Sequence, residues 1–286
     1  MFTHTLDVHG VPVPRFLYGT AWKEDDTARL VTQALEVGFI GIDTANQRKH
    51  YHEAGVGEAL RGAKVRPFLQ TKFTHRAGQD ARLPYDPKAP LALQVRQSFE
   101  SSLDHLGVDT IDSYVLHGPS TRSGWSAGDL EVWRAMEALH DEHQTKLLGV
   151  SNVSLEQLEA LCARARVPPA MVQNRCYARF QWDGEVRAFC RQRGLVYQGF
   201  SLLTANAAEL QRPAIADVAR RLKRTPAQVV FRFALQVGMV CLTGSTSREH
   251  LLHDLACFDF ELSDAEVRAI ERVTSLPAGF EPAPRR

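Results

Sequence analysis

Four side chains that together could transfer a proton stand at or just after short apolar runs of the sequence. Asp43, Lys72 and His117 each end such a run, and Tyr51 lies on the polar loop that follows Asp43. An ammonium beside a phenol stabilises the phenolate and lowers the pKa of the tyrosine, which makes it a good general acid near neutral pH. The set suits protonation of a developing alkoxide, as in carbonyl reduction by an external hydride donor, and requires no metal.

Each of these residues also has a plainer interpretation. Asp43 could cap the turn after its strand, Lys72 could be a solvated strand end, and His117 could be a hydrogen-bonded core histidine. A buried lysine or aspartate without a partner is costly, so we expect Lys72 and Asp43 to pair. His117 could then donate a hydrogen bond to the same substrate oxygen that Tyr51 protonates.

The elements that must position these residues alternate between short apolar runs and longer segments of helical periodicity. Eight strands are predicted, each followed by a helix. The predicted strands cover residues 15–20, 39–43, 67–72, 111–117, 146–150, 170–173, 195–200 and 239–243. The helices that follow them cover residues 26–37, 53–61, 91–106, 129–143, 154–165, 184–193, 215–222 and 247–255.

This order predicts an α/β protein, a closed (β/α)8 TIM barrel that forms a single domain over residues 1–286. Residues 6–13 are expected to add an N-terminal β-hairpin. Extra C-terminal helices are expected after Thr225-Pro226 and at the capping box that begins at Ser263. A doubly wound sheet is the main alternative, but the turn after the first strand lacks the glycine-rich pattern G-x-G-x-x-G.

Composition excludes several classes of protein. The formal net charge is +1 and charge is spread along the chain, so we expect no nucleic-acid partner. The N-terminus lacks a signal pattern and no apolar run is long enough to span a membrane. Five widely spaced cysteines without a CxxC pair suggest reduced thiols in a cytoplasmic protein. We expect a monomer that acts on a small molecule.

The chain resembles the aldo-keto reductases through short motifs that occur in order along nearly its whole length. These motifs are Gly19-Thr20 with Trp22, Ile42-Asp43-Thr44-Ala45, Thr71-Lys72, Leu116-His117-Gly118-Pro119, Gly149-Val150-Ser151-Asn152, Gln173-Asn174 and Phe258-Asp259-Phe260-Glu261-Leu262-Ser263. The resemblance implies a TIM barrel and reduction of aldehydes or ketones with NAD(P)H.

The resemblance also implies a role for individual residues. Tyr51 would be the proton donor, Lys72 would tune it, Asp43 would pair with Lys72, and His117 would orient the carbonyl. The implied cofactor-binding residues are Ser151, Asn152 and Gln173 at the nicotinamide carboxamide, Phe200 against the nicotinamide ring, and Thr20 and Asp43 near the ribose. Phe200 could instead be plain core, Ser151-Asn152 could cap a helix, and Asn174 could support Gln173.

The tyrosine loop departs from the family pattern. The family places its tyrosine five residues after the aspartate, and that position is Arg48 here. Tyr51 comes eight residues after Asp43, so the loop is longer before the tyrosine. We expect Tyr51 to reach the same point in space; the alternative is that it packs against the helix and that reduction is lost.

The end of the last strand departs as well. Gly244 and His250 stand where the family often has a lysine and an arginine that hold the adenosine 2′-phosphate. Hydroxyls and amides at the start of the following helix could still bind a phosphate, and a nearby arginine could supply charge. The residues concerned are Ser245, Thr246, Ser247 and Arg248. We therefore expect NADPH as the cofactor, with NADH possible.

The substrate pocket is expected to include Trp22, His117 and Trp125, with Gly118 opening one wall where relatives carry a tryptophan. The basic residues that surround Tyr51 could favour anionic substrates, although a solvated loop is the simpler interpretation; they are Arg48, Lys49, His50 and His52. Residues 203–213 and the proline-rich tail 277–286 would complete the pocket.

Two other functions remain open at this point. A regulatory protein could keep the barrel and the cofactor site without catalysis, which the displaced tyrosine would explain. A Schiff-base aldolase could use Lys72, but its lysine would require a desolvated pocket rather than an aspartate partner.

Overall fold

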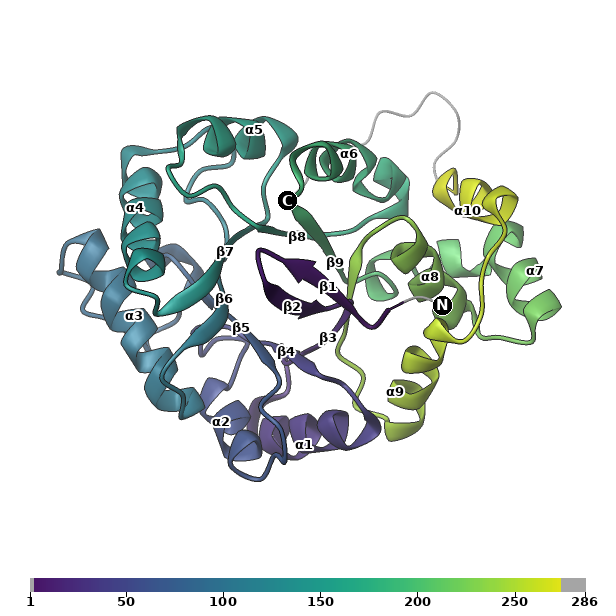
Figure 1. Ribbon diagram of the computed structural model, residues 1–286, viewed down its shortest axis with the longest axis horizontal. Helices are drawn as coiled ribbons and strands as arrows, with labels where there is room; N and C mark the ends of the chain where they lie inside the picture. The colour runs from purple at the N-terminus through teal and green to yellow at the C-terminus, as the bar shows by residue number, and fades with distance from the viewer. Residues whose placement is uncertain (1–2, 274–286) are drawn as a thin grey trace.

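Eight parallel strands close into a barrel in the computed structural model, which describes residues 3–273 (Figure 1). Neighbouring strands follow one another along the chain, and the last pairs with the first. The barrel strands are β3 (Phe16–Gly19), β4 (Gly41–Asp43), β5 (Phe68–Phe73), β6 (Ile111–Leu116), β7 (Thr145–Ser151), β8 (Met171–Arg175), β9 (Val196–Phe200) and β10 (Val240–Thr243). The predicted (β/α)8 TIM barrel is confirmed, because each of these strands lies within two residues of its expected bounds.

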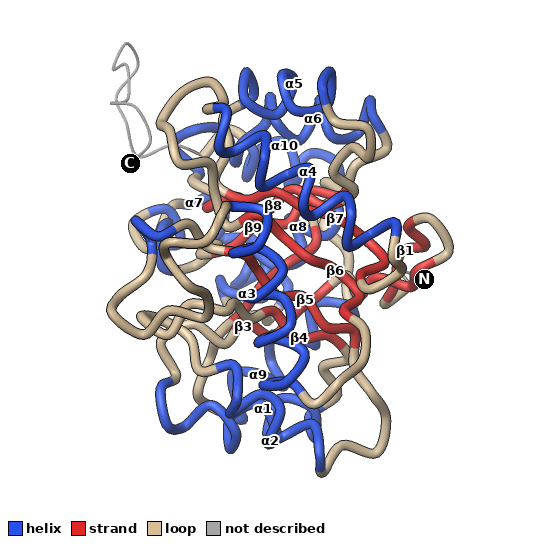
Figure 2. The backbone as a smooth tube through the Cα atoms, turned by 90° about the vertical axis from the view of Figure 1, so that its left-hand side faces the viewer, coloured by secondary structure: helices blue, strands red, loops and turns tan. Residues whose placement is uncertain are grey.

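Helices surround the strands as an outer layer, which Figure 2 shows from the side. Their bounds are α1 (Thr27–Val37), α2 (Glu53–Arg61), α3 (Leu91–Leu106), α4 (Ala127–Asp141), α5 (Leu155–Arg164), α6 (Gly184–Arg193), α7 (Pro213–Leu222), α8 (Pro226–Gln236), α9 (Arg248–Leu255) and α10 (Asp264–Glu271). The two extra helices, α8 and α10, begin as expected. Thr225 and Ser263 each form a capping box, in which the cap and the residue three positions on satisfy each other's backbone N–H.

A two-stranded hairpin covers the N-terminal end of the barrel. It consists of β1 (Thr5–Val8) and β2 (Val11–Pro14), and it lies across the middle of the ring in Figure 1. His9 and Gly10 both have positive φ at its turn, as a two-residue type I′ connection requires. The hairpin's buried valines pack against residues from the first half of several strands, namely Leu17, Phe68, Leu147, Met171 and Val240. With that end closed, the opposite, C-terminal end remains for chemistry.

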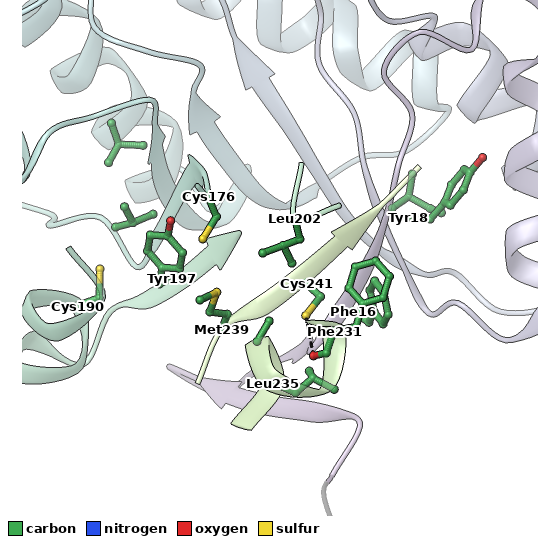
Figure 3. Close-up of a cluster of buried hydrophobic side chains, with 14 of the residues drawn as sticks. Phe16, Tyr18, Cys176, Cys190, Tyr197, Leu202, Phe231, Leu235, Met239 and Cys241 are labelled. Atoms are coloured by element: carbon green, nitrogen blue, oxygen red, sulfur yellow. Dashed lines mark hydrogen bonds between the residues drawn. The ribbon is translucent and has the colours of Figure 1, made fainter. Parts of the chain in front are cut away.

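The main core fills the space between the strands and the helices. Figure 3 shows the part around β10, where the rings of Phe16 and Phe231 pack together and Met239 is buried on the other side of Cys241. The Cys241 thiol is also buried there and donates a 3.6 Å hydrogen bond to the carbonyl of Phe231. Within residues 3–273 none of the five cysteines forms a disulfide, and only Cys162 is partly exposed.

Within residues 3–273, no helix has the length and apolar composition needed to cross a membrane. The tail 277–286, expected to complete the pocket, lies outside the residues that the structure describes.

Candidate active site

A buried ion pair joins the ends of β4 and β5. Lys72 Nζ donates to Asp43 Oδ1 at 2.7 Å and to Asp43 Oδ2 at 2.8 Å. Its third hydrogen bond goes to the carbonyl of Thr44 at 2.8 Å. The lysine is fully buried and the aspartate is 3% exposed, so water does not screen this pair. The ammonium is therefore fully engaged beneath the C-terminal end of the barrel.

Two glutamine side chains also donate hydrogen bonds to the carboxylate of Asp43. Gln70 and Gln173 donate to Asp43 Oδ1 at 2.7 Å and 3.0 Å. Each also donates its second N–H to Gln198 Oε1, at 2.8 Å and 2.9 Å. Ser113 donates to Gln70 Oε1 at 2.9 Å. A polar network thus crosses the barrel interior and fixes which way the amide of Gln173 faces.

The loop before Tyr51 is held by buried polar anchors. Asn46 donates to the carbonyl of Ser98 at 2.9 Å, and Gln47 donates to the carbonyl of Gly78 at 2.8 Å. The Tyr51 N–H in turn donates to the carbonyl of Gln47 at 3.0 Å. These contacts fold the longer loop back on itself, so that Tyr51 faces the barrel mouth.

Tyr51 lies directly above the ion pair and beside His117. Its ring centroid is 5.8 Å from that of His117, with the two rings in an edge-to-face arrangement, and 5.4 Å from Lys72 Nζ. Within residues 3–273, no hydrogen bond engages the Tyr51 phenol. Arg48, which occupies the family's usual tyrosine position, instead points toward Asp25 at 3.9 Å. The structure therefore brings Tyr51, and not Arg48, to the centre of the site.

The pKa of Tyr51 differs from the sequence-based expectation. Burial raises the pKa of the Tyr51 phenol above its usual value, the charge of Asp43 raises it further, and the charge of Arg175 lowers it. The expected net lowering of the Tyr51 pKa is wrong, because burial and the charge of Asp43 outweigh the positive charge nearby. Tyr51 consequently keeps its proton at neutral pH.

His117 is held in its neutral form. Burial lowers the pKa of His117 to about 3, and the positive charges of Lys72 and His50 contribute. Its Nδ1 lies 2.7 Å from the hydroxyl of Thr74, and Asn152 donates to its backbone carbonyl at 2.8 Å. The ring is thereby fixed on both its side-chain and its backbone side.

A cavity of about 960 Å³ opens above these residues. It reaches from Tyr51 and His117 at the barrel centre to α8 and α9 at its rim. Most strands contribute a C-terminal residue or one just beyond it to its wall, among them Gly19, Asp43, His117, Ser151, Arg175, Phe200 and Thr243. A long cavity at this end of a parallel barrel is the usual place for a ligand.

Comparison with known proteins identifies the family. The model described as "Aldo/keto reductase family" matches residues 17–275. The chain belongs to the aldo/keto reductase family.

Similar proteins match this chain along nearly its whole length. The oxidoreductase YtbE of Bacillus subtilis is 29% identical over 96% of this chain and 94% of its own length. The 9,11-endoperoxide prostaglandin H2 reductase of Trypanosoma cruzi is 28% identical over 93% and 89%. The crystal structure of apo Gox0644 superposes with a TM-score of 0.81 at 27% identity, covering 98% of this chain and 96% of that one. A mutant of Gox0644 has been solved in complex with NADPH, with a TM-score of 0.78, 27% identity, and coverage of 92% and 90%.

The expected cofactor-binding residues divide into two groups. Ser151, Asn152, Gln173, Phe200 and Ser245 line the cavity, as does Asp43. The others do not line it, and they are Thr20, Thr246, Ser247 and Arg248. Thr20 is fully buried and donates to the carbonyl of Asp43 at 3.1 Å, so it supports the aspartate's backbone. Ser247 accepts from the His250 N–H and caps α9.

The expected substrate residues also separate. Trp22 lines the cavity, is 69% exposed, and stacks on His50 with ring centroids 4.0 Å apart. Trp125 is not part of the cavity wall, because its indole donates to the carbonyl of Gln157 at 2.7 Å and its ring packs on the core. Of the basic residues around Tyr51, only His50 lines the cavity. From the loop 203–213, Leu203 and Thr204 contribute to the wall.

The polar residues of the site that were missed from sequence include two on the cavity wall and two in the interior network. Lys23 lines the cavity and donates to the carbonyl of Gly244, while Arg175 lines it from the end of β8. Gln70 and Gln198 form the interior network. A signal was present for three of them, since residues two apart on a strand share a face. Gln70 precedes Lys72, Gln198 precedes Phe200, and Arg175 follows Gln173 by that spacing.

Proposed function

We propose that this protein reduces the carbonyl group of an aldehyde or a ketone with a reduced nicotinamide dinucleotide, and that Tyr51 donates the proton. One observation carries the proposal: the Tyr51 phenol and the neutral His117 ring face one cavity directly above the Lys72–Asp43 pair. Membership of the aldo/keto reductase family supports the reaction class.

The donor set of the cavity fits a nicotinamide cofactor. Gln173 uses both N–H groups of its amide inside the barrel, which leaves its carbonyl oxygen to accept from a carboxamide NH2. Ser151 and Asn152 offer further polar groups beside it, and Phe200 offers a ring for stacking. When bound, the cofactor supplies the hydride, and every other step falls to the protein.

The protein's own residues would polarise and protonate the carbonyl oxygen. Tyr51 keeps its proton at neutral pH, so the phenol can donate it as negative charge develops on that oxygen. If Thr74 donates its hydroxyl proton to His117 Nδ1, the proton of the neutral imidazole resides on Nε2 and can be shared with the same oxygen. Lys72 and Asp43 form a buried ion pair without net charge beneath Tyr51.

NADPH is the cofactor that we propose, with NADH as the alternative. The support is the NADPH complex of the Gox0644 mutant together with basic side chains on this cavity wall. Lys23 lies beside Gly244 and Ser245, and two histidines, His250 and His253, line the wall from α9. These groups could meet phosphate oxygens, although no lysine or arginine occupies the family's usual positions at Gly244 and His250.

The function is tested by following NADPH oxidation at 340 nm across a panel of aldehydes, ketones and sugars, with the alcohol product identified by NMR. Carbonyl-dependent oxidation supports a reductase. NADPH binding without turnover on any carbonyl would instead indicate a regulatory protein on the same barrel. Titration with NADPH and NADH gives the two dissociation constants, and tighter binding of NADH would overturn the cofactor preference.

A further inference from the structure

Arg175 places a positive charge in the cavity wall close to the reacting centre. It is the last residue of β8, two residues beyond Gln173, and its guanidinium carbon lies 5.5 Å from the ring centroid of Phe200. Its charge also lowers the pKa of the Tyr51 phenol, in opposition to burial. Arg175 therefore lies within electrostatic range of the proposed proton donor.

No carboxylate of residues 3–273 forms an ion pair with Arg175. The acidic residues of the cavity wall bind other protein groups or belong to α9 at the rim of the cavity. Asp43 is bound by Lys72, Asp254 accepts from Thr243 at 2.8 Å, and Glu249 belongs to α9. The charge of Arg175 is thus left for a ligand.

The contact with Phe200 places the exposed guanidinium over the ring and uses none of its hydrogen bonds. A guanidinium that packs on an aromatic ring does so through its π face, while its N–H groups point outward in the guanidinium plane. That plane presents the fork of donors that matches the two oxygens of a carboxylate. His50, another basic side chain of the cavity wall, has a pKa lowered by burial and by Lys49 and is largely neutral at pH 7.

We propose that Arg175 binds the carboxylate of the substrate, so that this reductase prefers short aldehydes or ketones that carry a carboxylate over their neutral counterparts. The proposal rests on the proposed function and names its substrate class. It makes Arg175 a specificity-determining residue, with Tyr51 and His117 acting on the carbonyl.

The test compares 4-oxobutanoate with its methyl ester, which has the same aldehyde without the charge. A hydrogen bond to a charged group contributes about 1.5–3 kcal/mol, so kcat/KM for the acid should exceed that for the ester by roughly 10- to 100-fold. In Arg175→Gln this ratio should fall by about tenfold or more, while Arg175→Lys should keep part of it. Arg179→Gln is the matched control, because Arg179 is an exposed arginine on the same segment that stacks on Tyr177 outside the cavity.

Three results would overturn the proposal, and a fourth would contradict the function on which it rests. Equal kcat/KM for acid and ester in the wild-type protein would show that no carboxylate is recognised. Weaker NADPH binding in Arg175→Gln would assign the arginine to the cofactor, and tighter binding would show that the guanidinium competes with the nicotinamide for Phe200. Absence of turnover with both substrates and with the wider carbonyl panel would instead contradict the reductase function itself.

Discussion

Gln173 and Asp43 are joined by a 3.0 Å hydrogen bond from the amide Nε2 to the carboxylate Oδ1. The bond links the end of β8 to the end of β4 across the barrel. It makes the proposed cofactor contact and the proposed acid site parts of one network, since the same carboxylate holds Lys72 beneath Tyr51. Disturbing either end should therefore affect both cofactor binding and proton transfer.

Gln198→Leu should weaken cofactor binding although Gln198 lies outside the cavity wall. The substitution removes the acceptor of two amides, those of Gln70 and Gln173, and an unsatisfied buried donor costs about 1–3 kcal/mol. We expect the dissociation constant for NADPH to rise about tenfold, as measured by quenching of intrinsic fluorescence. A dissociation constant within twofold of the wild-type value would show that the network does not orient Gln173.

Lys72→Met should destabilise the fold as well as the reaction. The change leaves the buried carboxylate of Asp43 without its cation, and breaking a buried pair from one side costs about 3–5 kcal/mol. Urea unfolding should show this as a lower midpoint. Lys146→Met is the control, because Lys146 is half-exposed and Asp112 retains its bond to Arg66, so the loss there should stay below about 1 kcal/mol. Equal losses in the two variants would contradict the account of the buried pair.

His117 should contribute to acid sensitivity of the fold but not to the pH profile of the reaction near neutrality. Its folded-state pKa of about 3 lies below the ordinary value of 6.5, so the unfolded chain binds the extra proton first. Its contribution to stability is therefore complete above about pH 6.5 and is lost progressively as the pH falls toward about 3.

Urea unfolding of the wild-type protein and His117→Gln at about pH 8 and about pH 5 measures this contribution. We expect the glutamine variant to lose less stability between the two values. An equal loss, or an inflection in kcat/KM that His117→Gln removes near pH 6.5, would show that the ring titrates normally.

The fold was predictable because each barrel strand is a short run buried on both faces, followed by a periodic helix. The reach of Tyr51 was harder to predict, because its loop is anchored by contacts that are distant in sequence. Asn46 donates a hydrogen bond to the carbonyl of Ser98, and Gln47 donates one to the carbonyl of Gly78. No local sequence pattern predicts such partners. Sequence could pair Asp43 with Lys72, but it could not show that all three hydrogen bonds of the ammonium go to Asp43 and the carbonyl of Thr44.

The direction and the hydrogen-bond partner of individual side chains explain the remaining differences. Thr20 and Trp125 carry functional groups suited to a binding site, yet each donates its hydrogen bond to a backbone carbonyl of the protein. Arg175, in contrast, was not predicted but lines the cavity. It lies two residues after Gln173 on β8, so both side chains are on the cavity face of that strand.

The central claim is that Tyr51, displaced along its loop, is the proton donor. Tyr51→Phe removes only the hydroxyl, and the loop anchors at Asn46 and Gln47 remain. The most direct measurement is the single-turnover rate of carbonyl reduction by this variant at saturating NADPH, together with its dissociation constant for NADPH. We predict a rate at least about 100-fold below that of the wild-type protein, with an unchanged dissociation constant. A rate within a few-fold of the wild-type value would contradict the assignment.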